Sequence, residues 1–567
     1  MDTRDNGRWM GELVGGSGFH TGRPQSRRWP ANATSARYDG LSVLQQLRHS
    51  NQYRQYSARD GDRRTDKRVY GSERLARHGE RREGYASDLN LSTVELSIDG
   101  GAYLPVTGTE AWTYGWNTAT VTGGAKDGVA LNTRATDLAG NVTVSSTVTV
   151  DVHPYIGALS KVAAVRGEDI TITGDNFTTS TTVNFPGASG TAIKTFTSST
   201  SIVVTIPAGA VSGDLTVSTN GLTSNGKKLD IWDVITFNAG THVSAIKDAP
   251  GNIYTAFAYS SGDRYAGFRK YTYATSIWET VVNLDNQAIG GGFSYTSVAV
   301  SGANVWVAYY DSKGNPVEMS ISTNGGLNFP TKVNITTTIL NYLSLGVSGT
   351  NLYLSGYDTT AKSLTVFRSD NSGATWDDGT TVDSELGGDI GKYASLGMMQ
   401  NGYPVISYRD AVNKRLKLAY FDGSSWTKRI VDGSGNMGEY SSLKVDSAGG
   451  IHISYFNGNA ADLMYAYAST AGGVFSLETV VSDGLSGYNT ALALDAADKP
   501  HIVMYDYSAN GMVYARKTGA SWETFSIPDA NAPTFPSTIT AIVVDPTGKP
   551  WMYYPTGAGI RQANFIQ

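Results

Sequence analysis

Tyrosine, accompanied by an aspartate or an asparagine, recurs through the last three-fifths of this 567-residue chain, at intervals of 47 to 52 residues. One tyrosine of each repeat precedes a run of alternating apolar and polar residues, and a second, usually followed by an acid or an amide, ends the next run. Aromatic faces stack on sugars and carboxylates accept hydrogen bonds from hydroxyls, so this pattern fits a surface for a neutral or cationic glycan. In the structural alternative, the acid caps a turn and the tyrosine fills the gap between repeats. The three series are Tyr295, Tyr342, Tyr393, Tyr440 and Tyr488; Tyr309, Tyr357, Tyr408, Tyr455, Tyr505 and Tyr553; and Asp311, Asp358, Asp410, Asn457 and Asp506.

One repeat departs from the others in its charges. Tyr408 is followed by Arg409 before Asp410, and Glu439 precedes Tyr440. A departure from a repeat indicates where function separates from scaffold. The sequence therefore predicts a ligand-binding site on the loop face where the tyrosines and acids meet. Its predicted members are Tyr295, Tyr393, Tyr440, Asp311, Arg409 and Asp410.

Two histidines, His452 and His501, occupy equivalent positions in successive repeats, where other repeats carry tryptophan, tyrosine or valine. A position that accepts such different side chains is typical of a packing layer, and a metal site would need nitrogens from separate repeats to aim at one point. The chain contains no cysteine, which excludes disulfides and cysteine-based zinc sites. We therefore predict neither a metal nor a cofactor.

The elements that would position these residues are short strands. Each repeat holds four alternating runs, such as Ile451 to Phe456 and Leu463 to Tyr467, separated by Gly, Asn, Asp and Ser. Four antiparallel strands per repeat predict a propeller blade. Six complete units follow Ser244, and a seventh has only three runs. We expect 232–567 to form a seven-bladed propeller in which Trp232 to Phe237 completes the last blade and leaves no open edge.

Composition and charge limit the partners. Residues 1–85 carry 17 Lys and Arg against 10 Asp and Glu, whereas the remainder is acidic, so nucleic acid is not expected as a partner. No apolar run is long enough to span a membrane, and the first residues lack the apolar core of a secretion signal. Residues 1–88 have few apolar runs and are predicted to be disordered, as a basic arm for an anionic surface or as a stretch that is not native.

Two segments before the repeats resemble known small β domains. Residues 89–153, with VELSIDGGAYLPV and the run from Arg134 to Asn141, resemble bacterial Ig-like domains but lack a recognisable first strand, and Trp112 and Trp116 are expected in the core. Residues 154–231, with GEDITITGDNF and SIVVTIPAGAV, resemble the IPT/TIG domain, an Ig-like module. The expected fold class is all-β, with two Ig-like β-sandwich domains followed by a seven-bladed β-propeller. Such modules imply spacers in exported bacterial proteins and carry little functional information.

Two turns, SDNSGATW and STNGGLNF, resemble the Asp box (BNR repeat) of sialidase-like propellers. In such a turn the Asn bonds backbone amides, a glycine supplies an unusual torsion and the aromatic residue packs between sheets. The box is a structural turn in that family and implies fold alone. Its residues here are Ser322, Asn324, Gly326, Phe329, Ser369, Asn371, Gly373 and Trp376.

The same resemblance implies a catalytic alternative, in which three arginines clamp a carboxylate beside a Tyr/Glu pair. The candidates are Arg264, Arg409, Glu439 and Tyr440, with Arg561 nearby, although the family's Arg-Ile-Pro motif is absent. We expect an extracellular or bacterial cell-surface binding or adhesion protein whose propeller binds a glycan or a surface protein. The alternatives are a glycan-cleaving enzyme, either a sialidase-like glycoside hydrolase or a polysaccharide lyase, and a structural stalk component.

Overall fold

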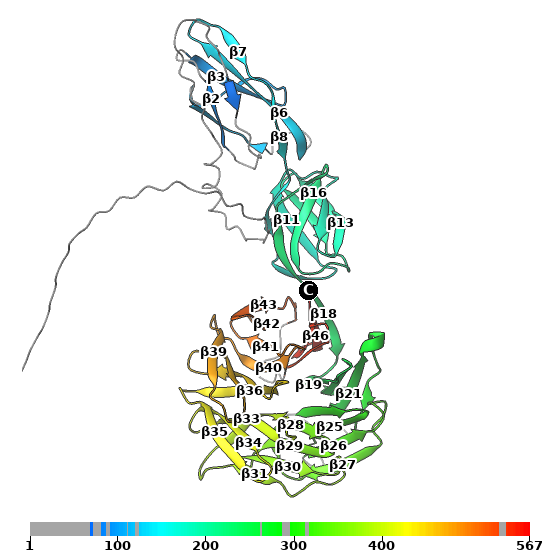
Figure 1. The fold of residues 1–567 in the computed structure, drawn as a ribbon. Coiled ribbons are helices and arrows are strands. Elements are labelled where there is room, and N and C mark those ends of the chain that lie inside the picture. Colours follow the sequence, from blue (N-terminus) through cyan, green and yellow to red (C-terminus); the bar gives the residue numbers. More distant parts are fainter. Residues whose placement is uncertain are drawn as a thin grey trace, which may run out of the picture. The chain divides into compact units, whose positions relative to one another are not determined.

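The computed structural model describes residues 69–71, 81–86, 91–109, 111–118, 124–260, 264–285, 295–311, 317–531 and 540–567. These residues form an all-β protein, which confirms the predicted fold class (Figure 1). Most of the predicted basic segment, 1–88, lies outside the described residues. None of the helices in the described part combines the length and the apolarity that crossing a bilayer requires.

The first domain is a sandwich of two sheets. The larger sheet contains β3 (Leu91–Ile98), β4 (Leu104–Pro105), β6 (Lys126–Asp137), β7 (Val142–Val144) and β8 (Val148–Val152), and the smaller contains β1 (Val69–Gly71), β2 (Arg81–Ala86) and β5 (Ala111–Gly115). Trp112 and Trp116 are buried in the core between them, as predicted. The predicted start at residue 89 is too late, because β2 pairs with β5 along its length. The sequence RREGYA has no apolar alternation, so this backbone pairing left no pattern to detect.

The second domain is also a sandwich. One sheet contains β9 (Tyr155–Leu159), β11 (Asp169–Asp175), β14 (Thr195–Ser198) and β15 (Ser201–Thr205). The other contains β10 (Ala163–Val165), β12 (Thr182–Phe185), β13 (Ala188–Ala192), β16 (Gly213–Thr219), β17 (Leu222–Thr223) and the long β18 (Lys227–Asn238). Alternating buried residues from both sheets, such as Ile170, Ile172, Val217 and Ile231, fill one core.

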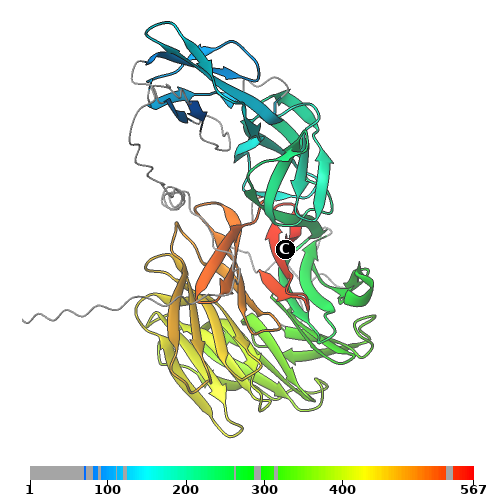
Figure 2. The ribbon, with the colours of Figure 1, turned by 45° about the horizontal axis from the view of Figure 1, so that its top comes forward.

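In the part of the chain that the structure describes, the strands after β18 form seven sheets. The first strand of each sheet lines a common central cavity. The colours in Figure 2 run from green through yellow to red across these sheets. Sheet 1 contains β19 (Thr241–Lys247), β20 (Ile253–Ser260), β21 (Arg264–Thr272), β22 (Ile277–Trp278) and β23 (Val282–Asn283), and sheet 2 contains β24 (Thr296–Ser301), β25 (Asn304–Tyr310), β26 (Val317–Ser322) and β27 (Thr331–Thr336).

The next three sheets have four strands each: sheet 3 contains β28 (Leu340–Ser348), β29 (Asn351–Asp358), β30 (Ser363–Ser369) and β31 (Thr380–Asp383), sheet 4 contains β32 (Ile390–Met398), β33 (Pro404–Asp410), β34 (Arg415–Phe421) and β35 (Trp426–Asp432), and sheet 5 contains β36 (Met437–Val445), β37 (Ile451–Asn457), β38 (Asp462–Ala468) and β39 (Ser476–Val481).

Sheet 6 contains β40 (Tyr488–Leu494), β41 (Pro500–Asp506), β42 (Gly511–Thr518) and β43 (Ser521–Ser526), and sheet 7 contains β44 (Ala541–Val544), β45 (Pro550–Thr556) and β46 (Gly559–Ile566).

Sheet 7 takes its outer strand from the other end of the domain. β18 pairs antiparallel with β46, and Trp232 lies opposite Phe565. Trp232 is fully buried, and its ring packs against Phe565 at a centroid distance of 4.9 Å. The pairing covers the edge of β46 that would otherwise be open to another chain.

Neighbouring sheets are joined by hydrogen bonds near their inner edges. The Oγ of Ser297 accepts the backbone N–H of Leu345 in the next sheet at 2.9 Å. The same bond recurs from Leu396 to Ser344, from Leu443 to Ser395 and from Leu492 to Ser442, at 2.9 to 3.1 Å. Because each bond links one inner strand to the next, the series fixes the sheets around a common axis.

The two turns that resemble the Asp box have the hydrogen bonds expected from their sequences. In the second turn, Gly373 N donates to Ser369 Oγ at 2.9 Å and Thr375 N donates to Asn371 Oδ1 at 3.0 Å. Gly373 has φ 86°, so the turn needs glycine for its torsion, and a Cβ there would lie 2.3 Å from Cε at the end of the Met319 side chain, which would have to shift. In the first turn, Phe329 packs on Phe268 of the preceding sheet.

The second tyrosine series divides into two structural classes. Three of its positions donate a hydroxyl hydrogen bond to a carboxylate of the preceding sheet: Tyr408 to Asp383, Tyr455 to Asp432 and Tyr554 to Asp529, at 2.7, 2.7 and 2.9 Å. The sequence assignment of Tyr553 to this series is wrong by one residue, since Tyr554 makes the contact. Tyr357 and Tyr505 sit one residue further along their strands and bond Asp389 and Asn510 instead.

Candidate functional site

Five tyrosines of successive inner strands contact one another in a curved row, which we call the tyrosine arc. It contains Tyr295, Tyr342, Tyr393, Tyr440 and Tyr488, with consecutive ring centroids 5.3, 4.7, 4.8 and 5.9 Å apart. The planes of neighbouring rings are tilted by 41° to 59°, so the rings do not stack flat on one another. All five side chains are partly buried. His242 extends the row beyond Tyr295 at a centroid distance of 6.0 Å.

The arc lies at one end of a central channel. The channel is a cavity of about 570 Å³ that is lined by the inner strands of all seven sheets. Its lining begins at Thr296, Leu343, Ala394 and Ser441, each directly after a tyrosine of the arc. The tyrosine that opens each repeat is thus placed at the same end of the channel, where a ligand would meet several aromatic side chains at once.

Strained backbone holds three of these rings in place. Tyr342, Tyr393 and Tyr440 have φ of 56°, 55° and 55°, a left-handed conformation that costs a residue with a Cβ about 1–2 kcal/mol. The pairing register of each inner strand shifts at these positions, which marks a β-bulge. Bulges re-aim side chains, and strain that persists in a fold often marks a functional site. The sequence did not reveal this conformation, because tyrosine gives no signal for positive φ.

The hydroxyls of the arc are neutral hydrogen-bonding groups. Burial raises the pKa of Tyr295, Tyr342, Tyr393 and Tyr440 above the usual tyrosine range. The side chains of Tyr295 and Tyr393 interact with that of Tyr342 and contribute to these shifts. A neutral phenol both donates and accepts, which suits the hydroxyl groups of a sugar.

Arg409 lies beside the arc but is largely occupied. Its guanidinium forms an ion pair with Glu439, and its Nη2 donates to Asn436 Oδ1 at 2.7 Å. The side chain is buried, and its Nε has no hydrogen-bond partner among the described residues. Burial lowers the pKa of Arg409, and the hydroxyls of Tyr393 and Tyr440 lie close enough to favour its charge. The structure therefore brings Arg409, Tyr393 and Tyr440 together, with the arginine charge already neutralised by Glu439.

The two predicted aspartates of the site have other contacts. Asp410 is buried and accepts hydrogen bonds from Asn413 N and Asn413 Nδ2, both at 2.9 Å, so it caps the turn after β33. The equivalent residues cap their own turns in three other sheets, as Asp358, Asn457 and Asp506. For these positions the structure shows the turn-capping role that the sequence left as an alternative.

Asp311 belongs to a buried acidic cluster at the junction of sheets 1 and 2. Its carboxylate and those of Asp285 and Glu318 have oxygens within 4.8 Å of one another. The ammonium of Lys332 lies 2.8 Å from Asp285 and 2.7 Å from Glu318. Burial raises the pKa of Glu318. With a lysine bridging two of its three carboxylates, the cluster is an ion-pair network that joins the sheets.

The catalytic candidates do not form a three-arginine clamp in the described residues. Arg561 pairs with Asp529 at 2.8 Å and donates to Thr236 Oγ1 at 2.7 Å, whereas Arg409 pairs with Glu439. Each guanidinium therefore has a different set of partners. The side chain of Arg264 lies outside the described residues. Glu439 and Tyr440 remain adjacent to Arg409, as the sequence places them.

The two histidines have structural roles. His452 is buried, and its ring nitrogens contact Tyr465 Oη at 2.6 Å and Asp446 Oδ2 at 3.0 Å. His501 contacts Tyr514 Oη at 2.6 Å in the same way. Other repeats fill the position with Tyr254 and Trp551, which donate to Asp248 and Asp545 across the same hairpin turn. The shared function of this position is to fasten a turn to its strand.

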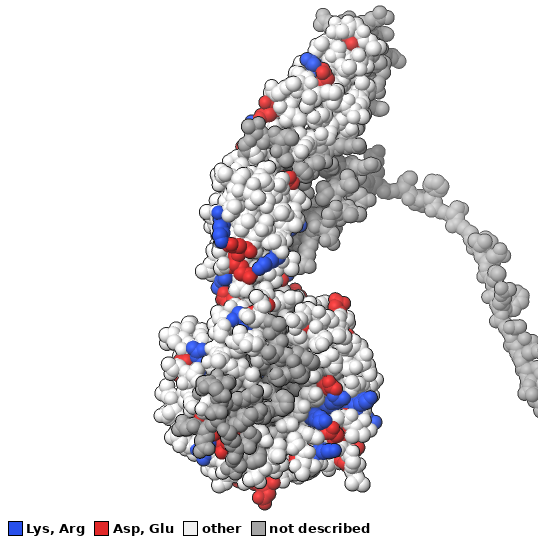
Figure 3. Space-filling model, turned by 180° about the vertical axis from the view of Figure 1, so that it is seen from behind, with Lys and Arg blue, Asp and Glu red and all other residues white. Residues whose placement is uncertain are grey.

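On the face drawn in Figure 3, the charged side chains of the described residues are of both signs. In the view of Figure 3, blue and red side chains lie next to one another over the described residues, and most of this face is uncharged. Exposed pairs such as Lys126 with Asp99 and Lys194 with Asp169 place opposite charges side by side. Charges of both signs that neutralise one another do not provide the basic stripe that nucleic acid requires.

Comparison with known proteins identifies one domain and a set of similar folds. Residues 154–231 match the IPT/TIG domain. No curated protein matches the sequence. Among solved structures, the chain is similar to a polysaccharide lyase, an ulvan lyase bound to -[GlcA(1-4)Rha3S]-, with a TM-score of 0.44 and 13% identity over 59% of this chain and 96% of that one. It is also similar to an auxiliary nutrient binding protein from Bacteroides thetaiotaomicron (TM-score 0.36, 12% identity, 73% of this chain and 98% of that one) and to a Hadza microbial sialidase (TM-score 0.35, 11% identity, 65% and 76%). These likenesses concern the fold alone.

Proposed function

We propose that this chain is an extracellular or cell-surface glycan-binding protein whose ligand lies on the tyrosine arc. In this proposal 232–567 is a seven-bladed propeller that carries the site, and the domains at 89–153 and 154–231 are spacers. The observation that carries the proposal is the row of five contacting tyrosines at the channel end. Three of these tyrosines have the unfavourable left-handed backbone conformation. Packing between sheets alone does not require that conformation.

The chemistry of the arc favours a neutral glycan. Tilted, partly exposed rings offer apolar surface to the C–H faces of a sugar, and neutral phenols exchange hydrogen bonds with its hydroxyls. Arg409 beside the arc is paired with Glu439, and Asp389, which interacts with Tyr342, is paired with Lys392, so these charges neutralise one another. An acidic sugar would have to displace Glu439 from Arg409, whereas a neutral sugar would leave the ion pair intact.

A glycan array probed with the full-length chain tests this function. We expect neutral oligosaccharides among the hits, and replacing Tyr393 or Tyr440 with alanine should weaken binding by about three- to tenfold, since an aromatic contact contributes roughly 0.5–1.5 kcal/mol. Tyr155→Ala is the matched control, because this exposed tyrosine lies in the IPT/TIG domain. Equal affinity of the two arc variants and the control would place the ligand elsewhere.

The enzyme alternative is tested on the same material. Glu439 and Tyr440 lie beside Arg409, so each glycan that binds is incubated with the protein and analysed for released sugars or unsaturated products. Turnover that Glu439→Gln abolishes would replace the binding function by a glycan-cleaving one. Binding without turnover supports the proposal as stated.

A further inference from the structure

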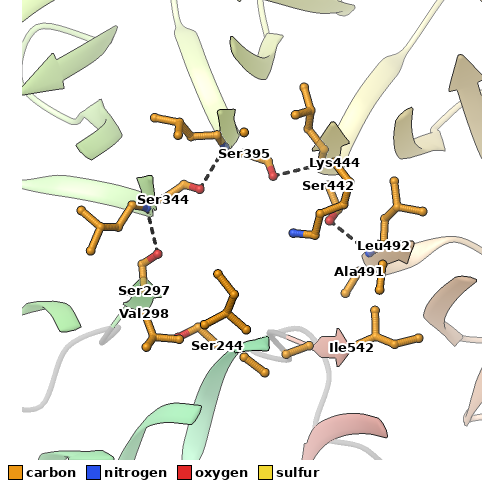
Figure 4. Close-up of a pocket in the computed structure, with 18 of the residues that line it drawn as sticks. Ser244, Ser297, Val298, Ser344, Ser395, Ser442, Lys444, Ala491, Leu492 and Ile542 are labelled. Atoms are coloured by element: carbon orange, nitrogen blue, oxygen red, sulfur yellow. Dashed lines mark hydrogen bonds between the residues drawn. The ribbon is translucent and has the colours of Figure 1, made fainter. Parts of the chain in front are cut away.

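One inner strand carries a lysine that the other repeats lack. Lys444 of β36 occupies a position where the other inner strands have small or apolar residues, namely Ile246, Ala299, Gly346, Gly397, Ala493 and Val543. This position faces the next sheet at close range: a Cβ on Gly397 would lie 2.6 Å from Leu443 Cδ2. A long side chain has no room between the sheets, and Lys444 instead extends into the central channel (Figure 4).

The channel is positively charged in an otherwise acidic folded region. Among the described residues that line it are two lysines, Lys247 and Lys444, and no aspartate or glutamate. Lys444 has no ion-pair partner among the described residues, and burial within the ring of strands lowers the pKa of its amine. Its side chain is exposed to the space of the channel rather than to the outer surface. An ammonium in this position has no carboxylate among the described residues to offset its charge.

Hydroxyl groups surround the same space. Ser297, Ser344, Ser395 and Ser442 line the channel, and each Oγ accepts a backbone N–H of the next sheet (Figure 4). A serine oxygen that accepts an amide hydrogen keeps its own hydrogen for donation. The wall of the channel therefore combines the lysine ammonium of Lys444 with a ring of hydroxyl donors, and such a set of donors is the complement of an oxyanion.

We propose that the central channel is a binding site for a small oxyanion, such as sulfate, phosphate or the carboxylate of a small acid, held by Lys444 Nζ and the serine hydroxyls. The cavity volume of about 570 Å³ lies within the range of roughly 300–1,000 Å³ that is usual for small-molecule sites. The site is separate from the tyrosine arc, and it uses none of the arc's side chains.

Isothermal titration of the full-length protein with sodium sulfate, sodium phosphate and sodium glucuronate tests the site. The key variant is Lys444→Met, which keeps the length of the side chain and removes its charge. The control is Lys414→Met, in an exposed turn between β33 and β34. We expect saturable binding of at least one anion, and a loss of about ten- to a hundredfold in affinity in Lys444→Met alone, as for a charge-assisted hydrogen bond. If sulfate or phosphate binds, the ligand of the channel is a free inorganic ion. If glucuronate alone binds, the ligand is a sugar acid.

A structural readout covers the case in which Lys444→Met alters the fold. Selenate, an anomalous scatterer of sulfate shape, soaked into crystals of the wild-type protein should give a peak within hydrogen-bond distance of Lys444 Nζ. No anion binding in the wild-type protein, or equal affinity in Lys444→Met and the control, overturns the proposal. Neither result bears on the arc, because glycan binding is measured separately with the Tyr393 variant.

Discussion

Comparing the stability of Tyr393→Ala with that of Tyr393→Gly separates two contributions to the free energy of unfolding: the strained backbone conformation of residue 393 and the contacts of its ring. Both variants lose the contacts with Tyr342 and Tyr440 at 4.7 and 4.8 Å, about 1–3 kcal/mol together for two aromatic pairs. They differ in the backbone, because φ at this position is 55° and only alanine keeps the left-handed cost of about 1–2 kcal/mol. Glycine is normally the less stable of the two by about 0.5–1 kcal/mol. At position 393 we therefore expect glycine to equal or exceed alanine in stability.

Tyr488 provides the matched control for this comparison. It belongs to the same arc, but in sheet 6 the positive φ falls on Asn489, at 51°, rather than on the tyrosine. Here alanine should be the more stable variant. The two orders should differ by about 1–2 kcal/mol, which is a shift of a few degrees in melting temperature for a domain of this size. Calorimetry of the full-length variants measures it, and the same order of alanine and glycine at both positions would refute the strained conformation of the arc.

Three further predictions concern the scaffold. Gly373→Ala should lower the melting temperature by several degrees, because the turn at this position has a positive φ and the added Cβ would contact Met319 of the neighbouring sheet. An unchanged melting temperature would mean that the turn and Met319 adjust without cost. Burial lowers the folded-state pKa of His452 below its unfolded value, so this residue contributes stability above pH 6.5 that is lost as the pH falls through the folded pKa. Melting temperatures between pH 7.5 and 5 should fall less steeply in His452→Gln, and parallel curves would contradict this. A chain that starts at Thr241 lacks β18 and should aggregate through the exposed edge of β46, unlike one that starts at Lys227, as light scattering can show.

The strands themselves could be predicted because the repeat marks their positions several times over. Aromatic residues, turn residues and alternation agree in every repeat, and the pairing of Trp232 with Phe565 follows from the same pattern. The side-chain directions could not be predicted in the same way. A shift of one residue in a strand reverses the face of its side chain. Tyr357 and Tyr554 show this effect, since the regular spacing of tyrosines conceals the fact that they make different contacts.

The candidate site was predicted in part. Arg409, Tyr393 and Tyr440 do come together, and the sequence pointed to them because sheet 4 breaks the repeat in charge. The neutralisation of the Arg409 charge could not be predicted from the sequence, because its partner Glu439 lies 30 positions away in the chain and in another sheet. Asp410 illustrates the opposite case, in which a residue with suitable chemistry is consumed by a local turn.

Two departures from the repeat, Glu439 and Lys444, lie on one strand, β36, and the third, Arg409, lies on β33 and pairs with Glu439. β36 carries Glu439 and Tyr440 at the arc and Lys444 in the channel. Tyr440 and Lys444 are four residues apart, which corresponds to about 13 Å along an extended strand at 3.3 Å per residue. A single small ligand therefore does not reach both positions. The scaffold requires neither change, because the equivalent positions in sheet 6 are filled by Tyr488 and Ala493 without a charge. A neutral ligand on the arc and an anion in the channel would each use one end of β36, which is why variants at Tyr440 and Lys444 should affect different ligands.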